Sequence, residues 1–415
     1  MVSANADGGA GDVFGRRQSK GKSACRYISE QGFLNLQHYE YQGSDNSVVY
    51  RYFCSPFAEA LVQRCVPRWL APNVITCIGL VLSCIGHLVI WYYSPGMQEK
   101  CPQWAWIWLS FCTFAYQTLD NMDGKQARRT QSSSPIGLLL DHGGDAINIV
   151  LSSMNLVAMF QLGGGRDMMQ CLIMWYSSTL PFFWATWEEL FTGSLYLGPF
   201  NGPTDGVLIV CFAELFSGLV EDYSSFWSTE VSWALGLSRK SCIVAFFFLC
   251  VLGTILDNMR RVFRVVGSWP AFLRALLLAM PFMASLVFPS VLLMCTVPGQ
   301  VLFASHPRLI LWLWGLAFLK LVFHLQLAHI CNEAYQPWRR SFFLLMAGVL
   351  CCPIIKRLLQ QQLQTQIWEP ELLWLQVITF GMALANLHLV VSVIHSVAVF
   401  LDVRIFHIDA KVAEE

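Results

Sequence analysis

Four aspartates stand together in the stretch from Asp120 to Asp145, in a chain that is otherwise strongly apolar. Asp120 and Asp123 are three positions apart, and Asp141 and Asp145 are four apart, so on a helix each pair would share one face. Apolar runs precede and follow the stretch. A carboxylate among apolar segments is costly, and four of them indicate a functional site.

Small side chains accompany both acidic pairs. Gly124 and Ala127 fall on the face that carries the first pair, and Gly137 lies one turn before Asp141. The polar run from Arg128 ends in Pro135, a residue that favours the first turn of a helix. The sequence therefore predicts helix, turn and helix, with two acidic faces that converge beside an open space.

Converging carboxylates repel one another, and a divalent cation or a pair of them would relieve that repulsion. Ligands that are all oxygen suit Mg²⁺ or Mn²⁺, which commonly also bind substrate phosphates. The predicted metal ligands are Asp120, Asp123, Asp141 and Asp145, with Arg128 placed to hold phosphate oxygens. The alternative is a buried ion-pair network in which the aspartates are neutralised by Lys125, Arg128 and Arg129.

The spacing of these residues, from Asp120 through Asp123-Gly124, Ala127-Arg128 and Gly137 to Asp141 and Asp145, resembles the signature of the CDP-alcohol phosphotransferases. The runs Asp-Gly-Lys-Gln-Ala-Arg-Arg-Thr and Asp-His-Gly are similar to the eukaryotic choline/ethanolamine branch. The resemblance implies transfer of phosphocholine or phosphoethanolamine from CDP-choline or CDP-ethanolamine to diacylglycerol, with release of CMP. It implies two Mg²⁺ or Mn²⁺ ions, a homodimer, and the membrane of the endoplasmic reticulum or Golgi. It assigns binding of the CDP-alcohol to Asn73, Gly124, Ala127, Arg128 and Gly137.

The resemblance also implies roles for three residues near the proton transfer. His142 matches the proton acceptor, and Asp145 is the competing base. Asp205 matches a position usually filled by Glu, which raises the basicity of the catalytic His, here directly or through a bridging water. Asn73, assigned to the nucleotide, has the simpler alternative of capping the first membrane helix.

The composition predicts an integral membrane protein of the all-α class. Hydrophobic residues make up 55% of the 415 residues and charged residues only 13%, whereas soluble domains are about one quarter charged. The zero net charge and the lack of a basic face exclude nucleic-acid binding. We expect a bundle of about ten transmembrane helices, at 74–93, 104–119, 136–162, 168–191, 206–220, 242–263, 271–295, 309–330, 341–359 and 372–401.

Composition shifts divide the chain into five parts. Residues 1–30 are expected to be disordered and cytosolic, and residues 31–73 to form an interfacial segment with an amphipathic helix from Val48 to Val66. The predicted catalytic core is 74–265, and 266–401 would add helices for dimerisation and entry of the lipid acceptor, before a tail at 402–415. The distribution of Lys and Arg places the acidic site on the cytosolic side.

Two other functions fit parts of this pattern. One keeps the family chemistry but uses another acceptor, such as inositol, glycerol phosphate or a ceramide. The other is a cation transporter whose path is lined by intramembrane aspartates. Acids clustered at one end of two helices, with no second copy in the chain, favour the enzyme.

Acidic and aromatic residues outside the motif have less distinctive patterns. Glu188 and Glu189 could meet an ammonium headgroup, but a solvated helix end is the simpler interpretation. His329 lies in an apolar run and is expected to pack or to line a polar cavity. A cation–π cage or an interfacial aromatic belt would each account for Trp184, Trp187, Tyr116 and Tyr196.

Overall fold

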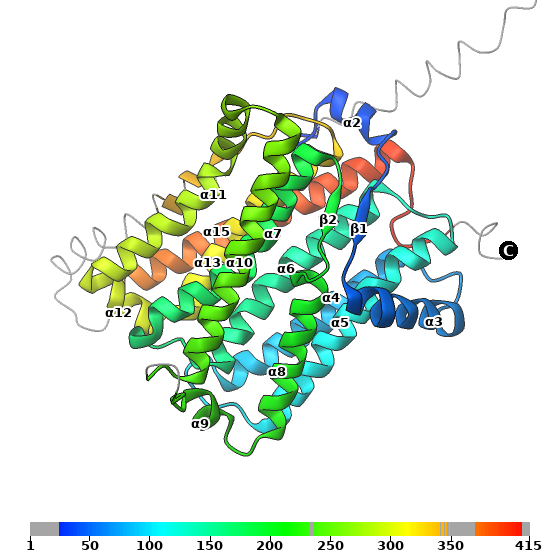
Figure 1. The fold of residues 1–415 in the computed structure, drawn as a ribbon. Coiled ribbons are helices and arrows are strands. Elements are labelled where there is room, and N and C mark those ends of the chain that lie inside the picture. The colour runs from blue at the N-terminus through cyan, green and yellow to red at the C-terminus, as the bar shows by residue number, and fades with distance from the viewer. Residues whose placement is uncertain are drawn as a thin grey trace, which may run out of the picture.

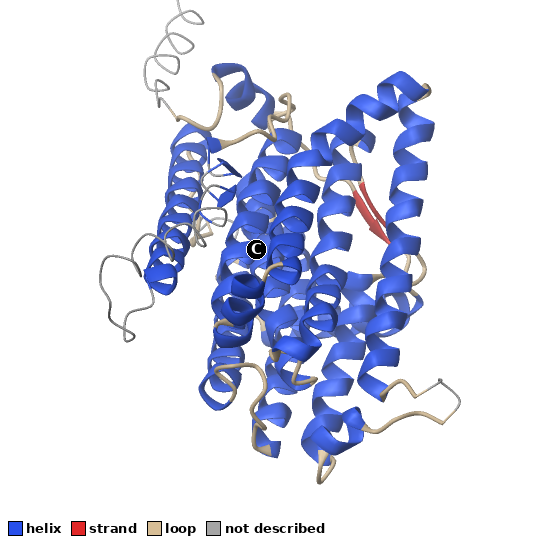
Figure 2. Ribbon diagram, turned by 90° about the vertical axis from the view of Figure 1, so that its left-hand side faces the viewer, coloured by secondary structure: helices blue, strands red, loops and turns tan. Residues whose placement is uncertain are grey.

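Helices make up almost the whole architecture, as the sequence predicts. The computed structural model describes residues 25–232, 236–340, 342–343, 345–346, 348 and 370–408. Long helices run side by side as a bundle (Figure 1). The strands of the described part form one two-stranded sheet, set between helices (Figure 2).

The first half of the chain contains the interfacial segment and the helices that carry the acidic motif. A π-helical turn, Tyr50–Cys54, leads into α3, so the predicted amphipathic helix is present. The elements are α2 (Glu30–Leu36), β1 (Gly43–Asp45), α3 (Ser55–Cys65), α4 (Pro72–Tyr93), α5 (Gln103–Arg129), α6 (Pro135–Met159), α7 (Met168–Thr192) and β2 (Leu195–Leu197).

The second half adds helices that pack around this group. A short π-helical turn, Gly202–Gly206, precedes α8. The elements are α8 (Val207–Leu219), α9 (Tyr223–Ser228), α10 (Arg239–Val266), α11 (Trp269–Cys295), α12 (Val297–Ser305), α13 (Pro307–Ile330) and α15 (Pro370–Leu401). The predicted span 341–359 and the predicted disordered segment 1–30 lie largely outside the described residues.

Six helical segments of the described chain are long and apolar enough to cross a membrane. They are Pro72–Tyr93, Gly202–Leu219, Arg239–Val266, Trp269–Cys295, Pro307–Ile330 and Glu371–Leu401. The helices α5, α6 and α7 are 27, 25 and 25 residues long but are not among the six. The chain is therefore a polytopic membrane bundle.

Helix α13 is the most enclosed of these segments and packs directly on α6. The two helices approach closely at two glycines, because a Cβ on Gly315 would lie 2.5 Å from Val150 and a Cβ on Gly143 would lie 2.6 Å from Phe323. Glycine at these points allows the backbones to meet, as small residues do between membrane helices. This packing holds the C-terminal end of α13 beside the acidic half of α6.

The parallel sheet attaches the N-terminal segment to the end of α7. Gly193 ends α7 in a left-handed conformation, with φ of 73°, which glycine adopts without strain. The chain then enters β2, where Leu195 pairs with Gly43 and Leu197 with Asp45 of β1. The pairing fixes residues 43–45 along one side of the bundle (Figure 1).

We predict that Gly315→Ala destabilises the protein, because its new methyl group would overlap Val150. The expected loss is about 1–3 kcal/mol, as for other overpacked sites, seen as a lower midpoint of thermal unfolding in detergent. Gly381→Ala in α15 is the control, since a Cβ there meets nothing within 4 Å. Equal midpoints for the two variants would show that the α6–α13 approach is looser than described.

Candidate functional site

A tight turn connects the two acidic helices. Helix α5 ends at Arg129, and Gln131 follows with a φ of 50°. Ser134 then caps α6, its hydroxyl oxygen accepting a hydrogen bond from the Gly137 N–H at 3.2 Å. Pro135 is the first residue of α6, where its missing N–H costs nothing. The predicted helix, turn and helix is thus formed at the predicted residues.

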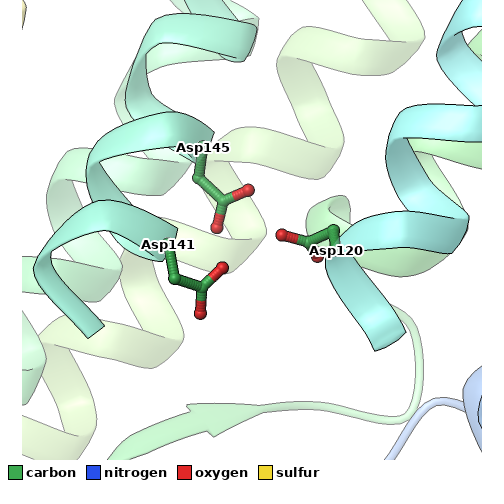
Figure 3. A group of neighbouring side chains, drawn as sticks. All are labelled: Asp120, Asp141 and Asp145. Carbon is green, nitrogen blue, oxygen red and sulfur yellow. The ribbon is translucent and has the colours of Figure 1, made fainter. Parts of the chain in front are cut away.

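Three of the four aspartates meet across this turn. Oxygens of Asp120, Asp141 and Asp145 lie within 4.8 Å of one another, a spacing that one metal ion could bridge. Figure 3 shows the Asp120 carboxylate, carried on α5, pointing at the two carboxylates on α6. Like charges at this distance repel strongly where water is scarce.

Asp123 lies outside this group of three and is the most buried of the four. Its carboxylate accepts hydrogen bonds from the Thr76 hydroxyl and from the Gly124 N–H. Asp145 is held in a similar way, by the Tyr116 hydroxyl, which donates to it at 2.8 Å. Neutral donors, rather than cations, therefore orient these two carboxylates.

The neighbouring basic residues bind elsewhere, which argues against an ion-pair network. Lys125 pairs with Glu59 at 3.4 Å, and Arg129 donates to the backbone oxygens of Val62 and Val66 at 2.6 and 2.9 Å. Both therefore anchor α5 to α3. Arg128 is exposed at the turn. No ion pair found in the described ranges includes any of the four aspartates.

The donor set and the space beside it suit a hard divalent cation. All the candidate ligand atoms are carboxylate oxygens, the type that Mg²⁺ and Mn²⁺ prefer. A Cβ built on Gly124 meets only the tip of the Arg128 side chain, at 3.6 Å, so the predicted open space is present. Ala127, in the last turn of α5, is half-buried.

Asn73 lies at the edge of the site, at the start of α4. The helix cap is Ala71, so the simpler expectation that Asn73 caps α4 is wrong. Its side-chain nitrogen donates to the Ile405 oxygen at 2.7 Å, and its side-chain oxygen would lie 3.4 Å from a Cβ on Gly137. This places Asn73 beside the first turn of α6, within one side chain of the predicted nucleotide-binding glycine.

His142 lies between the two aspartates of α6 and is half-buried. Its ring meets the edge of the Tyr41 ring, with centroids 5.7 Å apart. Its backbone oxygen accepts a long bond, 3.4 Å, from the Gln326 side chain of α13. The ring is thus covered by the N-terminal segment, and its backbone lies between Asp141 and Asp145 on α6.

Asp205 belongs to a different network in the described structure. One oxygen accepts from the Ser47 hydroxyl at 3.0 Å and the other from the Asn201 N–H at 2.9 Å. Thr204 and Asn201 also donate to Asp45 at the end of β1. These bonds tie the sheet to the loop before α8, and none of the described hydrogen bonds joins Asp205 to His142.

The structure also brings polar residues from outside the acidic motif to the site. Tyr116 could have been selected because it stands one helical turn before Asp120, and Thr76 because it follows Asn73 by three. Glu188 and Glu189 are only 2% and 3% exposed, so the expectation of a solvated helix end is wrong. Tyr116 binds Asp145 and the Trp187 indole N–H donates to the Ala275 oxygen at 3.0 Å, so these rings do not enclose one common cation site.

Sequence comparisons are consistent with this geometry. The family described as CDP-alcohol phosphatidyltransferase matches residues 69–201. The chain is 31% identical over 400 residues to choline/ethanolaminephosphotransferase 1 of Arabidopsis thaliana, covering 93% of this chain and 100% of the plant protein. The chain belongs to the CDP-alcohol phosphatidyltransferase family.

Two further relatives match about half of the chain. Choline/ethanolaminephosphotransferase 1 of Saccharomyces cerevisiae is 36% identical over 193 residues, covering 46% of this chain and 48% of its own. An uncharacterised family protein of Dictyostelium discoideum is 36% identical over 245 residues, covering 58% and 56%. The residues matched by the family description include Asn73, the four aspartates and His142, and stop short of Asp205.

We predict that the purified phosphatidyltransferase binds Mn²⁺ through the acidic cluster without any nucleotide. Asp141→Asn should weaken binding at least roughly tenfold, because it removes one charged ligand, measured by the electron paramagnetic resonance of free Mn²⁺. The matched control is Asp222→Asn, an exposed aspartate paired with Lys100 at 2.9 Å. Equal Mn²⁺ affinity in both variants would contradict a metal site at Asp141.

Proposed function

We propose that this chain transfers phosphocholine or phosphoethanolamine from a CDP-aminoalcohol to diacylglycerol, releasing CMP and forming phosphatidylcholine or phosphatidylethanolamine. The observation that carries the proposal is the meeting of Asp120, Asp141 and Asp145 at one turn of a membrane bundle. A plant relative that aligns over its whole length has the corresponding activity in its name.

The acidic cluster is the proposed binding site for the diphosphate of the donor. Mg²⁺ or Mn²⁺, held by Asp120, Asp141 and Asp145 with Asp123 close by, would supply positive charge to phosphate oxygens and to the leaving CMP. Arg128, exposed at the turn, is free of the described ion pairs and is placed to bind another phosphate oxygen. Gly124, Ala127, Gly137 and Asn73 leave room along the same edge for the nucleotide.

His142 is the proposed proton acceptor. The hydroxyl oxygen of diacylglycerol attacks the phosphorus that carries the aminoalcohol, its proton passes to His142, and the bond from phosphorus to the CMP oxygen breaks. His142 follows Asp141 directly on α6, and a general base for this attack must lie within reach of the hydroxyl proton. Asp145 is a weaker candidate for the base, because Tyr116 already donates to one of its oxygens. Asp205 is a weaker candidate for direct contact with His142, since its two oxygens accept hydrogen bonds from Ser47 and Asn201.

An apolar cavity beside the site supports a lipid acceptor. It has a volume of about 160 Å³ and lies between α4, α6, α13 and α15, where its lining includes Gly143, Gly144, Phe323 and Val393. Gly143 and Gly144 stand between His142 and Asp145 in the chain. An acyl chain in this cavity would bring the diacylglycerol hydroxyl to the acidic end of α6. Inositol and glycerol phosphate have no acyl chain that could occupy the cavity.

The remaining assignments follow from the resemblance rather than from the described contacts. We propose a homodimer in the membrane of the endoplasmic reticulum or Golgi, with the acidic site on the cytosolic side. The exposed Arg128 at the α5–α6 turn supports that orientation, because basic residues near membrane helices favour the cytosol. Residues 266–401 are proposed to supply the dimer contacts and the lipid entry.

We predict that Asp141→Ala abolishes CMP release from CDP-choline and diacylglycerol, because the diphosphate loses its counter-charge. Chelation of divalent ions should stop the unaltered enzyme in the same way, and added Mg²⁺ or Mn²⁺ should restore it. The variant must remain inserted and monodisperse in detergent for the comparison to hold. Turnover that survives chelation would refute the metal role, and ion flux into proteoliposomes without CMP release would favour a transporter.

We predict that His142→Ala lowers the turnover number by roughly 10²–10⁴-fold, the usual contribution of a general base. The affinity for CMP should change little, because the ring is assigned to the proton and not to the nucleotide. His395→Ala, at an exposed position of α15, is the control. A parallel loss of CMP affinity and rate would assign His142 to binding instead.

A further inference from the structure

Glu189 is a buried carboxylate without a hydrogen-bond donor for one of its oxygens. The side chain is 3% exposed, and Oε1 accepts no hydrogen bond from the described residues. Its neighbour Glu188 has the opposite situation, because the Arg261 guanidinium donates to both of its oxygens, at 2.5 and 2.8 Å. A buried acceptor left unpaired costs free energy unless something else binds it. Glu189 therefore points to a ligand.

The surroundings of Glu189 are aromatic and polar. His329 of α13 is the titratable side chain found beside it, and its Nε2 lies 3.5 Å from Oε1, beyond the distance of a good hydrogen bond. The same nitrogen lies 3.3 Å from the Tyr39 hydroxyl, and the two rings meet edge to face with centroids 5.7 Å apart. Burial raises the pKa of the Tyr39 phenol, as does the Glu189 carboxylate, so Tyr39 stays neutral.

Tyr41 lies between the group formed by Glu189, His329 and Tyr39 and the proposed catalytic residues. Its ring contacts the His142 ring, and the charges of Glu189, Asp141 and Asp145 all act on it. The side chain remains 47% exposed, so one part of it is accessible to a ligand arriving from water. An aromatic side chain thus stands between the unpaired carboxylate and the acidic cluster.

A quaternary or primary ammonium group is the ligand that this combination recognises. Aromatic faces attract a desolvated cation, and a carboxylate supplies the full opposite charge. In the proposed reaction the aminoalcohol end of the donor must lie within one short linker of the phosphorus that is attacked. Tyr41 contacts the His142 ring, and His329, which lies beside Tyr39 and Glu189, acts on the charge of His142.

We propose that the Glu189 carboxylate, together with Tyr39 and Tyr41, binds the positively charged headgroup of the CDP-aminoalcohol beside His142. The inference rests on the proposed function and deepens it by naming the residues that select an ammonium-bearing donor. Choline has no N–H to donate and depends on charge and aromatic faces, whereas ethanolamine can also donate to Oε1 of Glu189.

The test compares CDP-choline with its neutral isostere, the CDP ester of 3,3-dimethylbutanol, in which carbon replaces the quaternary nitrogen. The unaltered enzyme should prefer CDP-choline in kcat/KM by at least roughly tenfold, the size of a desolvated charge interaction. Glu189→Gln should lose most of that preference while its affinity for CMP, which has no headgroup, is unchanged. Tyr41→Leu should reduce kcat/KM for CDP-choline more than for CDP-ethanolamine, and Tyr41→Phe should not.

Glu188→Gln is the matched control, because it alters an equally buried glutamate one position away that is already paired with Arg261. Its preference for the charged donor should persist even if its stability falls. The proposal is overturned if the unaltered enzyme uses both donors equally well, or if Glu189→Gln lowers kcat for both equally, which would make Glu189 a partner of His329 only. If Glu189→Gln does not fold, the donor comparison on the unaltered enzyme and on Tyr41→Leu decides.

Failure of this inference is distinguishable from failure of the proposed function. If the enzyme releases CMP from every donor at the same kcat/KM, the proposed reaction is supported and the proposed headgroup site is wrong. If it releases CMP from none of the three donors, the reaction itself is wrong.

Discussion

Repulsion among carboxylates is the constraint on which this structure depends. Oxygens of three aspartates lie within 4.8 Å of one another inside a helical membrane bundle. Such an arrangement raises the free energy of the folded chain unless a cation is present. The residues that could neutralise the acids internally, Lys125 and Arg129, are instead bound to α3. The aspartate cluster is therefore left without an internal counter-charge, while the nearby basic residues stabilise the packing of α5 on α3.

The surrounding helices fix the positions of the aspartate side chains. Helix α3 receives Lys125 and Arg129, α4 supplies Thr76 to Asp123, and α5 supplies Tyr116 to Asp145. The enclosed α13 packs on α6 through two glycines and brings Gln326 and His329 to the site. A preorganised set of oxygens binds a cation and a diphosphate with little rearrangement, which is where electrostatic catalysis gains most.

The residue spacing was sufficient to predict the helices, the turn at Pro135 and the meeting of the acidic faces, because all of these are local. It was also sufficient to expect space beside Gly124. The sequence raised an ammonium headgroup for Glu189 only as the less simple alternative, and it could not bring Glu189, His329 and Tyr41 together, since each lies on a different element. The same limit applies to Asp205, whose partners Ser47 and Asn201 come from separate loops. Which of these residues contact one another depends on tertiary packing, which the local sequence pattern does not reveal.

The parallel pairing of β1 with β2 has a consequence for how the chain is made. Its partners are separated by about 150 residues of sequence, as Gly43 pairs with Leu195. A nascent chain must thus leave the ribosome as far as residue 197 before Tyr39 and Tyr41 can be fixed over α6. Until then the hairpin of α5 and α6, with its aspartates, is in the bilayer without the N-terminal segment packed over it. The proposed headgroup site, which includes Tyr39 and Tyr41, is therefore the last part of the site to be assembled.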